Sequence, residues 1–261
     1  MGRNFLFIVE GEKTEPCILK AVLERWGYNA IKTKRILELQ EFNHSFDLSF
    51  DETKLTNAKD NVVIAQAPRN RLHDLVVLYK KHHIDLDKLF GTGENILFSG
   101  IFVIFDVDHT NASDLKEAFA FHCDETSSGL LLVSSPCIEI ISEPKRKDTL
   151  SVCHLGEYKS ARNVHCHNVH KKDVTQYIAD NFEALALEFL EKNLRDFKEP
   201  NVMEHPRLVI EAINKHNIRN VESVVYRYFT TVVYVALAYI SGATKEIDNY
   251  CIVKDLLEKK F

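Results

Sequence analysis

Carboxylates follow two apolar runs of this chain, and in that setting they can bind hard cations or transfer protons. Glu10 directly follows the first run, and Glu15 lies five residues further along. Asp106 follows the second run, and Asp108 stands two residues later. Carboxylates brought together repel one another at neutral pH unless a divalent cation lies between them. Oxygen ligands favour Mg²⁺ or Mn²⁺ over zinc, and such ions suit phosphoryl transfer.

The elements that position these carboxylates are expected to alternate between strand and helix. Continuous apolar runs are typical of buried parallel strands, and apolar residues three or four apart are typical of helices. Strands are expected at 4–9, 31–39, 46–50, 100–105 and 129–133, and helices at 14–26, at 71–83 and after an N-cap at Ser113; residues 61–65 form a short apolar run. This alternation predicts an α/β fold with a parallel sheet flanked by helices. In such folds ligands bind at the carboxyl edge of the sheet.

The pattern changes in the last third of the chain, where helical periodicity dominates. Helices are expected at 172–197, 206–216, 221–240 and 245–259. We therefore predict three parts: a catalytic core over 1–145, a His/Cys-rich basic connecting segment over 146–170, and an all-helical C-terminal extension over 171–261. One long helix would carry an aromatic stripe, expected to be core, of Tyr226, Tyr228, Phe229, Tyr234 and Tyr239.

Composition is that of an ordinary globular protein without a global basic charge. Of the 261 residues, 45% are hydrophobic and 27% charged, and the formal net charge is −5. A nucleic-acid role would therefore need a local basic patch. The cysteines are scattered, no signal-like segment opens the chain, and the longest apolar stretch, 230–240, is too short to span a bilayer. These features predict a cytoplasmic protein with free thiols and no membrane partner.

Three short segments occur in an order that a known family shows. They are Glu10-Gly11-Glu12-Lys13-Thr14-Glu15-Pro16 after the first strand, Asp106-Val107-Asp108 after a later one, and Ser134-Ser135-Pro136-Cys137-Ile138-Glu139 after the next. Together they resemble a Toprim domain, most closely the RloB-like group, which is often found with prokaryotic defence and restriction loci. The resemblance covers roughly residues 4–143. The chain departs from a full Asp-x-Asp-x-Asp pattern at Thr110, which leaves one or two bound metal ions open.

The resemblance implies a role for each matching carboxylate. Glu10 corresponds to the Toprim glutamate, a general acid/base and metal ligand. Asp106 and Asp108 correspond to the metal-binding aspartate pair, and Glu15 to the second acidic residue of nuclease-type Toprim sequences. Glu139 is a further candidate ligand. The implied cofactor is Mg²⁺ or Mn²⁺.

Two other sets of residues are candidates for ligand contacts. Contacts with nucleic-acid phosphates are expected from Lys13, Lys145, Arg146 and Lys147. Soft metal ligands gather at Cys153, His154, His165, Cys166, His167 and His170. Because no Cys-x2-Cys pair is present, this segment favours a polar surface loop over a zinc site. Phosphate contacts by its histidines are a further alternative.

Two functions of different classes follow from these patterns. The first is a Mg²⁺-dependent nuclease that cleaves DNA or tRNA as the effector of an anti-phage defence system. The chain is too short for the extra modules of topoisomerases and primases. The second is a non-catalytic metal-binding regulatory subunit of an ATPase-containing defence complex. Its ATPase would be a partner, because this chain has no P-loop motif.

Two questions stay open beside these functions. A third interpretation is a small-molecule phosphatase, because Asp-x-Asp also opens the sites of haloacid-dehalogenase-like enzymes. It would use Asp106 as a nucleophile, but that family usually carries the motif on its first strand. Assembly into a homo-oligomer is also left open by the sequence.

Overall fold

The computed structural model divides the chain into two compact units. The first comprises Met1–Phe105 and His109–Leu131, and the second Asp106–Asp108 and Leu132–Phe261. The structure describes residues 2–25, 27–39, 45–82, 98–107, 110–135, 138, 149–151, 157, 178, 180–181, 215, 217–219, 221–222, 225–227 and 229–230. The predicted part boundaries near residues 145 and 170 stay predictions.

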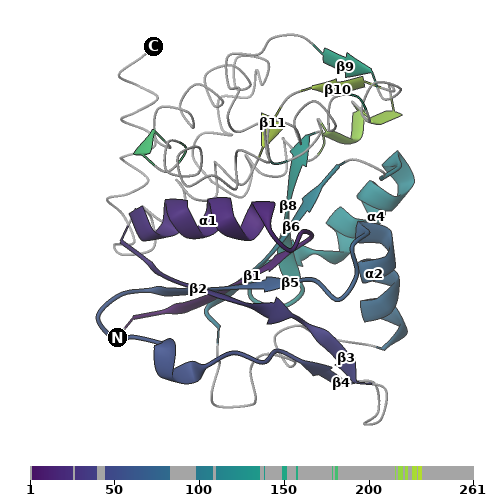
Figure 1. Ribbon diagram of the computed structural model, residues 1–261. Coiled ribbons are helices and arrows are strands. Elements are labelled where there is room, and N and C mark those ends of the chain that lie inside the picture. The colour runs from purple at the N-terminus through teal and green to yellow at the C-terminus, as the bar shows by residue number, and fades with distance from the viewer. Residues whose placement is uncertain are drawn as a thin grey trace. The chain divides into compact units, whose positions relative to one another are not determined.

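The sheet is mostly parallel and is flanked by helices, which confirms the predicted α/β class (Figure 1). β1 (Asn4–Val9) pairs in parallel with β5 (Asn61–Gln66) on one side and with β6 (Gly100–Asp106) on the other. β2 (Asn29–Arg35) pairs in parallel with β5. The order along the sheet is β11-β8-β6-β1-β5-β2, where β8 is Gly129–Ser135 and β11 is Phe229–Thr230.

The strands with continuous apolar runs are the buried ones. Every residue of β6 and β8 is buried, and so are five of the six residues of β1 and of β5. Phe7 of β1 contacts Phe102 of β6 edge to face, with ring centroids 5.3 Å apart. The register also places the last residues of three strands at one level, since Val9 pairs with Gln66 and Gln66 with Arg35.

Three helices are described in the first unit. α1 (Thr14–Arg25) packs on β2 and β5, and α2 (Leu72–Lys81) packs on α4 (Ala112–Phe121). The predicted N-cap of α4 is wrong by two residues. Asn111 caps this helix, because its side chain accepts a hydrogen bond from the Asp114 N–H at 2.9 Å. Ser113 lies inside the first turn.

The remaining elements of the first unit are short. They are β3 (Leu37–Leu39), β4 (Ser45–Asp47), the 3₁₀ helix η1 (Glu52–Lys54) and β7 (Cys123–Asp124). β3 and β4 form an antiparallel pair of their own, and β7 pairs with β8. The predicted strand at 31–39 is divided at Ile36, whose N–H donates to Gln66 O at 2.9 Å.

The second unit contains strands that were not predicted from the sequence. β9 (Thr149–Ser151) pairs antiparallel with β10 (Val225–Arg227), and β11 pairs antiparallel with the end of β8. The prediction of an all-helical extension, with one helix over 221–240, is therefore wrong at residues 225–227 and 229–230. Valine, tyrosine and phenylalanine favour strands, and the pairing partners come from distant parts of the chain. Helical backbone is found at 178, 180, 215, 217–219 and 221–222.

Candidate carboxylate site

Glu10 lies where β1 ends at the carboxyl edge of the sheet. Its backbone N–H donates to Ile104 O of β6 at 3.1 Å, and Gln66 Nε2 of β5 donates to Glu10 O at 3.5 Å. Ala67 N–H also donates to Val9 O at 2.8 Å. Both neighbouring strands therefore hold the backbone of β1 up to its last residue. The Glu10 side chain is half-buried at this position.

Glu15 lies in the first turn of α1 and is 7% exposed. Its carboxylate reaches back to the loop that follows Glu10, because a Cβ atom at Gly11 would lie 2.1 Å from Glu15 Oε2. Only glycine leaves room for the carboxylate there. Pro16 suits the first turn because its φ is already helical. Glu10 and Glu15 thus lie on either side of Gly11 in the turn from β1 into α1, whereas Glu12 of the same turn is exposed.

Asp106 is the last residue of β6 and is 8% exposed. Its Oδ1 accepts a hydrogen bond from the Ile138 N–H at 2.9 Å, and the next residue, Val107, donates its N–H to Ser134 O at 2.9 Å. Both bonds lie within the second unit. They join the Asp-Val-Asp segment to the segment around Ile138, two of the three segments singled out in the sequence.

The other predicted residues cannot be placed in the same way. Lys13 is described and exposed in the loop after β1. Outside the described residues lie Asp108, Glu139, Lys145, Arg146, Lys147 and the soft metal ligands Cys153, His154, His165, Cys166, His167 and His170. Their predicted roles stay predictions.

The described carboxylates fit a hard divalent cation. A buried carboxylate costs free energy unless it is hydrogen-bonded, paired with a cation or bound to a metal. In the first unit, Glu10 and the buried Glu15 offer only oxygen ligands, and in the second unit the buried Asp106 offers oxygen ligands as well. Mg²⁺ is usually held by one or two protein carboxylates and keeps several waters, so such ligands match its needs.

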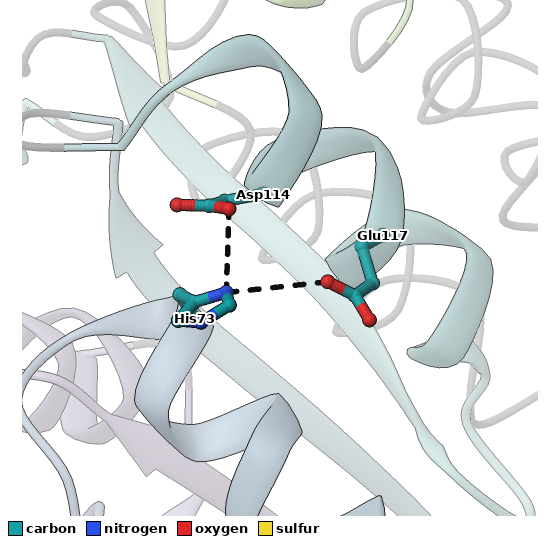
Figure 2. A group of neighbouring side chains, drawn as sticks. All are labelled: His73, Asp114 and Glu117. Carbon is teal, nitrogen blue, oxygen red and sulfur yellow. Dashed lines mark ion pairs between the residues drawn. The ribbon is translucent and has the colours of Figure 1, made fainter.

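A second cluster, which sequence reasoning missed, lies between α2 and α4. Figure 2 shows His73 of α2 facing Asp114 and Glu117 of α4. His73 Nδ1 lies 3.3 Å from Asp114 Oδ1 and 4.0 Å from Glu117 Oε2, and the three potential ligand atoms lie within 4.8 Å of one another. No sequence signal relates these positions, because only the packing of the two helices brings them together.

The charges of this second cluster already have partners in the protein. Lys80 Nζ lies 2.8 Å from Glu117 Oε1, and this hydrogen bond is the main reason that the pKa of Glu117 is lowered. Asn111 Nδ2 donates to Asp114 Oδ2 at 2.7 Å. The side chain of His73 is 45% exposed. We therefore interpret the cluster as an ion-pair network that joins two helices.

Comparisons with family models, with curated proteins and with solved structures found no match to this chain. Among the described residues, no helix combines the length and the apolar character that crossing a bilayer requires.

Proposed function

We propose that this protein is a Mg²⁺-dependent nuclease that hydrolyses phosphodiester bonds in DNA or tRNA. The observation that carries the proposal is the strand-to-helix turn at the carboxyl edge of the sheet, where Glu10 follows β1 and the Glu15 carboxylate reaches back to Gly11. Asp106 ends β6, the strand that pairs with β1. The Toprim-like order of the three sequence segments supports the same function.

Each described carboxylate has a role in this proposal. Glu15 would hold Mg²⁺ in the first unit, and Asp106 and Asp108 are the further ligands that the resemblance implies. When bound, Mg²⁺ would neutralise the charge that develops on the phosphate oxygens. Glu10 is half-buried at the end of its strand and would take the proton from the attacking water. The water oxygen forms the new bond to phosphorus, the bond to the leaving oxygen breaks, and Glu10 returns the proton to that oxygen.

The test compares the wild-type protein with Glu10→Gln on plasmid DNA and on total tRNA, with Mg²⁺, with Mn²⁺ and with EDTA. We expect metal-dependent cleavage that falls on the order of 100-fold or more in Glu10→Gln. The matched control is Glu12→Gln, an exposed carboxylate of the same loop, which should cleave like the wild type. Equal cleavage by wild type and Glu10→Gln would overturn the proposal.

A second outcome separates the nuclease from the regulatory subunit. If no polymer is cleaved but Mn²⁺ binding, measured by calorimetry, is lost in Asp106→Asn, the carboxylates hold a metal without catalysis. That result would contradict the nuclease and favour a metal-binding subunit that acts through a partner.

A further inference from the structure

Exposed cations gather where three adjacent strands of the first unit end. Lys34 and Arg35 close β2, Arg71 lies between β5 and α2, and Lys13 lies between β1 and α1. We call these four residues the edge cations. None of them forms an ion pair with any residue in the described part of the chain.

The strand register relates the segments that carry the edge cations, although up to 58 residues separate these cations in the sequence. Arg35 pairs with Gln66, and Gln66 pairs with Val9, the residue before Glu10. Neighbouring strands lie about 4.8 Å apart, so the backbone of Arg35 is roughly 10 Å from that of Val9. Lys13 and Arg71 lie in the segments that leave the same edge after β1 and β5, so all four edge cations belong to segments at the edge that includes Glu10.

At least half of the other described lysines and arginines of this unit form ion pairs with carboxylates. Four of these ion pairs lie away from the carboxyl edge: Arg3–Asp60, Lys20–Glu24, Lys54–Asp51 and Lys80–Glu117. Lys32, Lys59 and Lys81 are also exposed without an ion pair among the described residues; Lys32 lies within β2, Lys59 precedes β5 and Lys81 ends α2. Lys59 and Lys81 supply matched controls.

A purely structural reason explains only part of this pattern. Lysines on an outer strand prevent the strand from pairing with another chain, and this would account for Lys34 on β2. It does not account for Lys13 or Arg71, which lie outside the strands. Arg69, from the same loop as Arg71, has its own carboxylate partner, Glu38, at 2.7 Å.

We propose that the edge cations bind the sugar-phosphate backbone of a nucleic acid and guide it towards Glu10 and Glu15. This inference rests on the proposed function, because the edge ends beside the carboxylates that would act on a phosphodiester. Contacts of cations with phosphates are independent of sequence and weaken with salt. A row of separate cations along a sheet edge suits a chain of phosphates better than a single small anion.

The experiment measures binding without metal, so that it does not depend on cleavage. The wild type is titrated in EDTA against a fluorescent single-stranded oligonucleotide, a short duplex and tRNA, at several salt concentrations. We expect the triple variant Lys34→Gln, Arg35→Gln, Arg71→Gln to bind at least 10-fold more weakly. Each lost phosphate contact should reduce the salt slope by about 1, so the total reduction should be about 2 to 3. The control double variant Lys59→Gln, Lys81→Gln should keep the wild-type slope.

Failure of the edge-cation inference can be distinguished from failure of the nuclease proposal. Hydrolysis of bis(p-nitrophenyl) phosphate, a small diester that cannot span the edge, should be the same in wild type and triple variant. Unchanged polymer binding and slope in the triple variant would overturn this inference, whatever Glu10→Gln does to cleavage. Binding of polyglutamate as tight as that of the oligonucleotide, with the same loss in the triple variant, would also overturn it, because an acidic protein would then be the partner.

Discussion

Gly11 controls where the Glu15 carboxylate lies, because the two residues are in contact without room for a Cβ atom. Alanine at position 11 would push Oε2 away, and a flexible side chain can move without unfolding the protein. We expect Gly11→Ala to bind Mn²⁺ on the order of 10-fold more weakly, as typical for a disturbed metal ligand. The melting temperature should change little. Calorimetry with Mn²⁺ and a thermal melt would measure the two effects.

A double-mutant cycle tests whether Gly11→Ala acts through Glu15. In a Glu15→Ala background the Cβ atom at position 11 no longer meets a carboxylate. Gly11→Ala should then cause little further loss of Mn²⁺ affinity. Full additivity of the two losses would contradict the assignment. So would wild-type Mn²⁺ affinity in Gly11→Ala alone.

At the scale of helices and strands, prediction from the sequence succeeds where a local pattern alone determines the secondary structure. The runs at β1, β6 and β8 are apolar without interruption, and these strands are buried in the sheet. β10 and β11 were missed because three- and two-residue strands are too short to show a period, and distant partners define them. The cap of α4 was misplaced because Asn111 and Ser113 are both good N-cap residues, and only the hydrogen bond to Asp114 N–H distinguishes them.

In the candidate site, too, residues of one short segment can be identified from the sequence, whereas residues that only the sheet relates to one another cannot. Glu10 and Glu15 belong to one strand-to-helix turn, so a short segment indicates them. The edge cations come from β2 and from the segments that follow β1 and β5, and these strands have a different order in the sheet than in the chain. Sequence reasoning selected Lys13 alone among the edge cations, because no local pattern relates it to Arg35 or Arg71.

The opposite edge of the sheet is held by a buried asparagine. Asn61 is 1% exposed, and its Nδ2 donates to Asn4 Oδ1 and to Thr56 O, each at 2.9 Å. Its Oδ1 accepts from Asn29 Nδ2 at 2.7 Å and from Thr56 N–H at 3.0 Å. This one side chain therefore joins the beginnings of β1, β2 and β5.

We expect Asn61→Ala to lower the free energy of unfolding by about 2–3 kcal/mol, since buried polar partners lose their hydrogen bonds. Urea denaturation would measure the loss. The matched control is Asn57→Ala, an exposed asparagine nearby, which should change the free energy by about 0.5 kcal/mol or less. Mn²⁺ binding should be kept in both variants, because Glu10 lies at the other end of β1. Equal stability of the two variants would contradict the role of Asn61.

At the scale of the whole molecule, acid should destabilise the fold through His122. Its ring is buried between Tyr79 and Phe121, with centroids 5.9 Å and 4.8 Å away. Nδ1 donates to Ser128 O at 2.7 Å, and Nε2 has no hydrogen-bond partner among the described residues. Burial lowers the pKa of His122 from 6.5 to about 4, and the bond to Ser128 offsets only part of that effect.

The sign of the pH dependence follows from this lowered pKa. Above pH 6.5 the imidazole is neutral in both states, and its contribution to stability is complete. As the pH falls from 6.5 towards 4, the unfolded chain binds a proton that the folded protein does not. The free energy of unfolding should therefore drop by about 3 kcal/mol over this range through His122 alone. Exposed carboxylates with lowered pKa values, such as Glu117, add their own losses at more acidic pH.

Urea denaturation of wild type and His122→Leu across this pH range isolates the contribution of the histidine. Leucine cannot titrate, so the variant should be less sensitive to acid than the wild type, by about 3 kcal/mol between neutral pH and pH 4. The comparison holds even if leucine lowers stability at neutral pH, because Ser128 O then loses its donor at every pH alike. Parallel pH profiles for the two proteins would show that folding leaves the pKa of His122 unchanged, and would contradict this prediction.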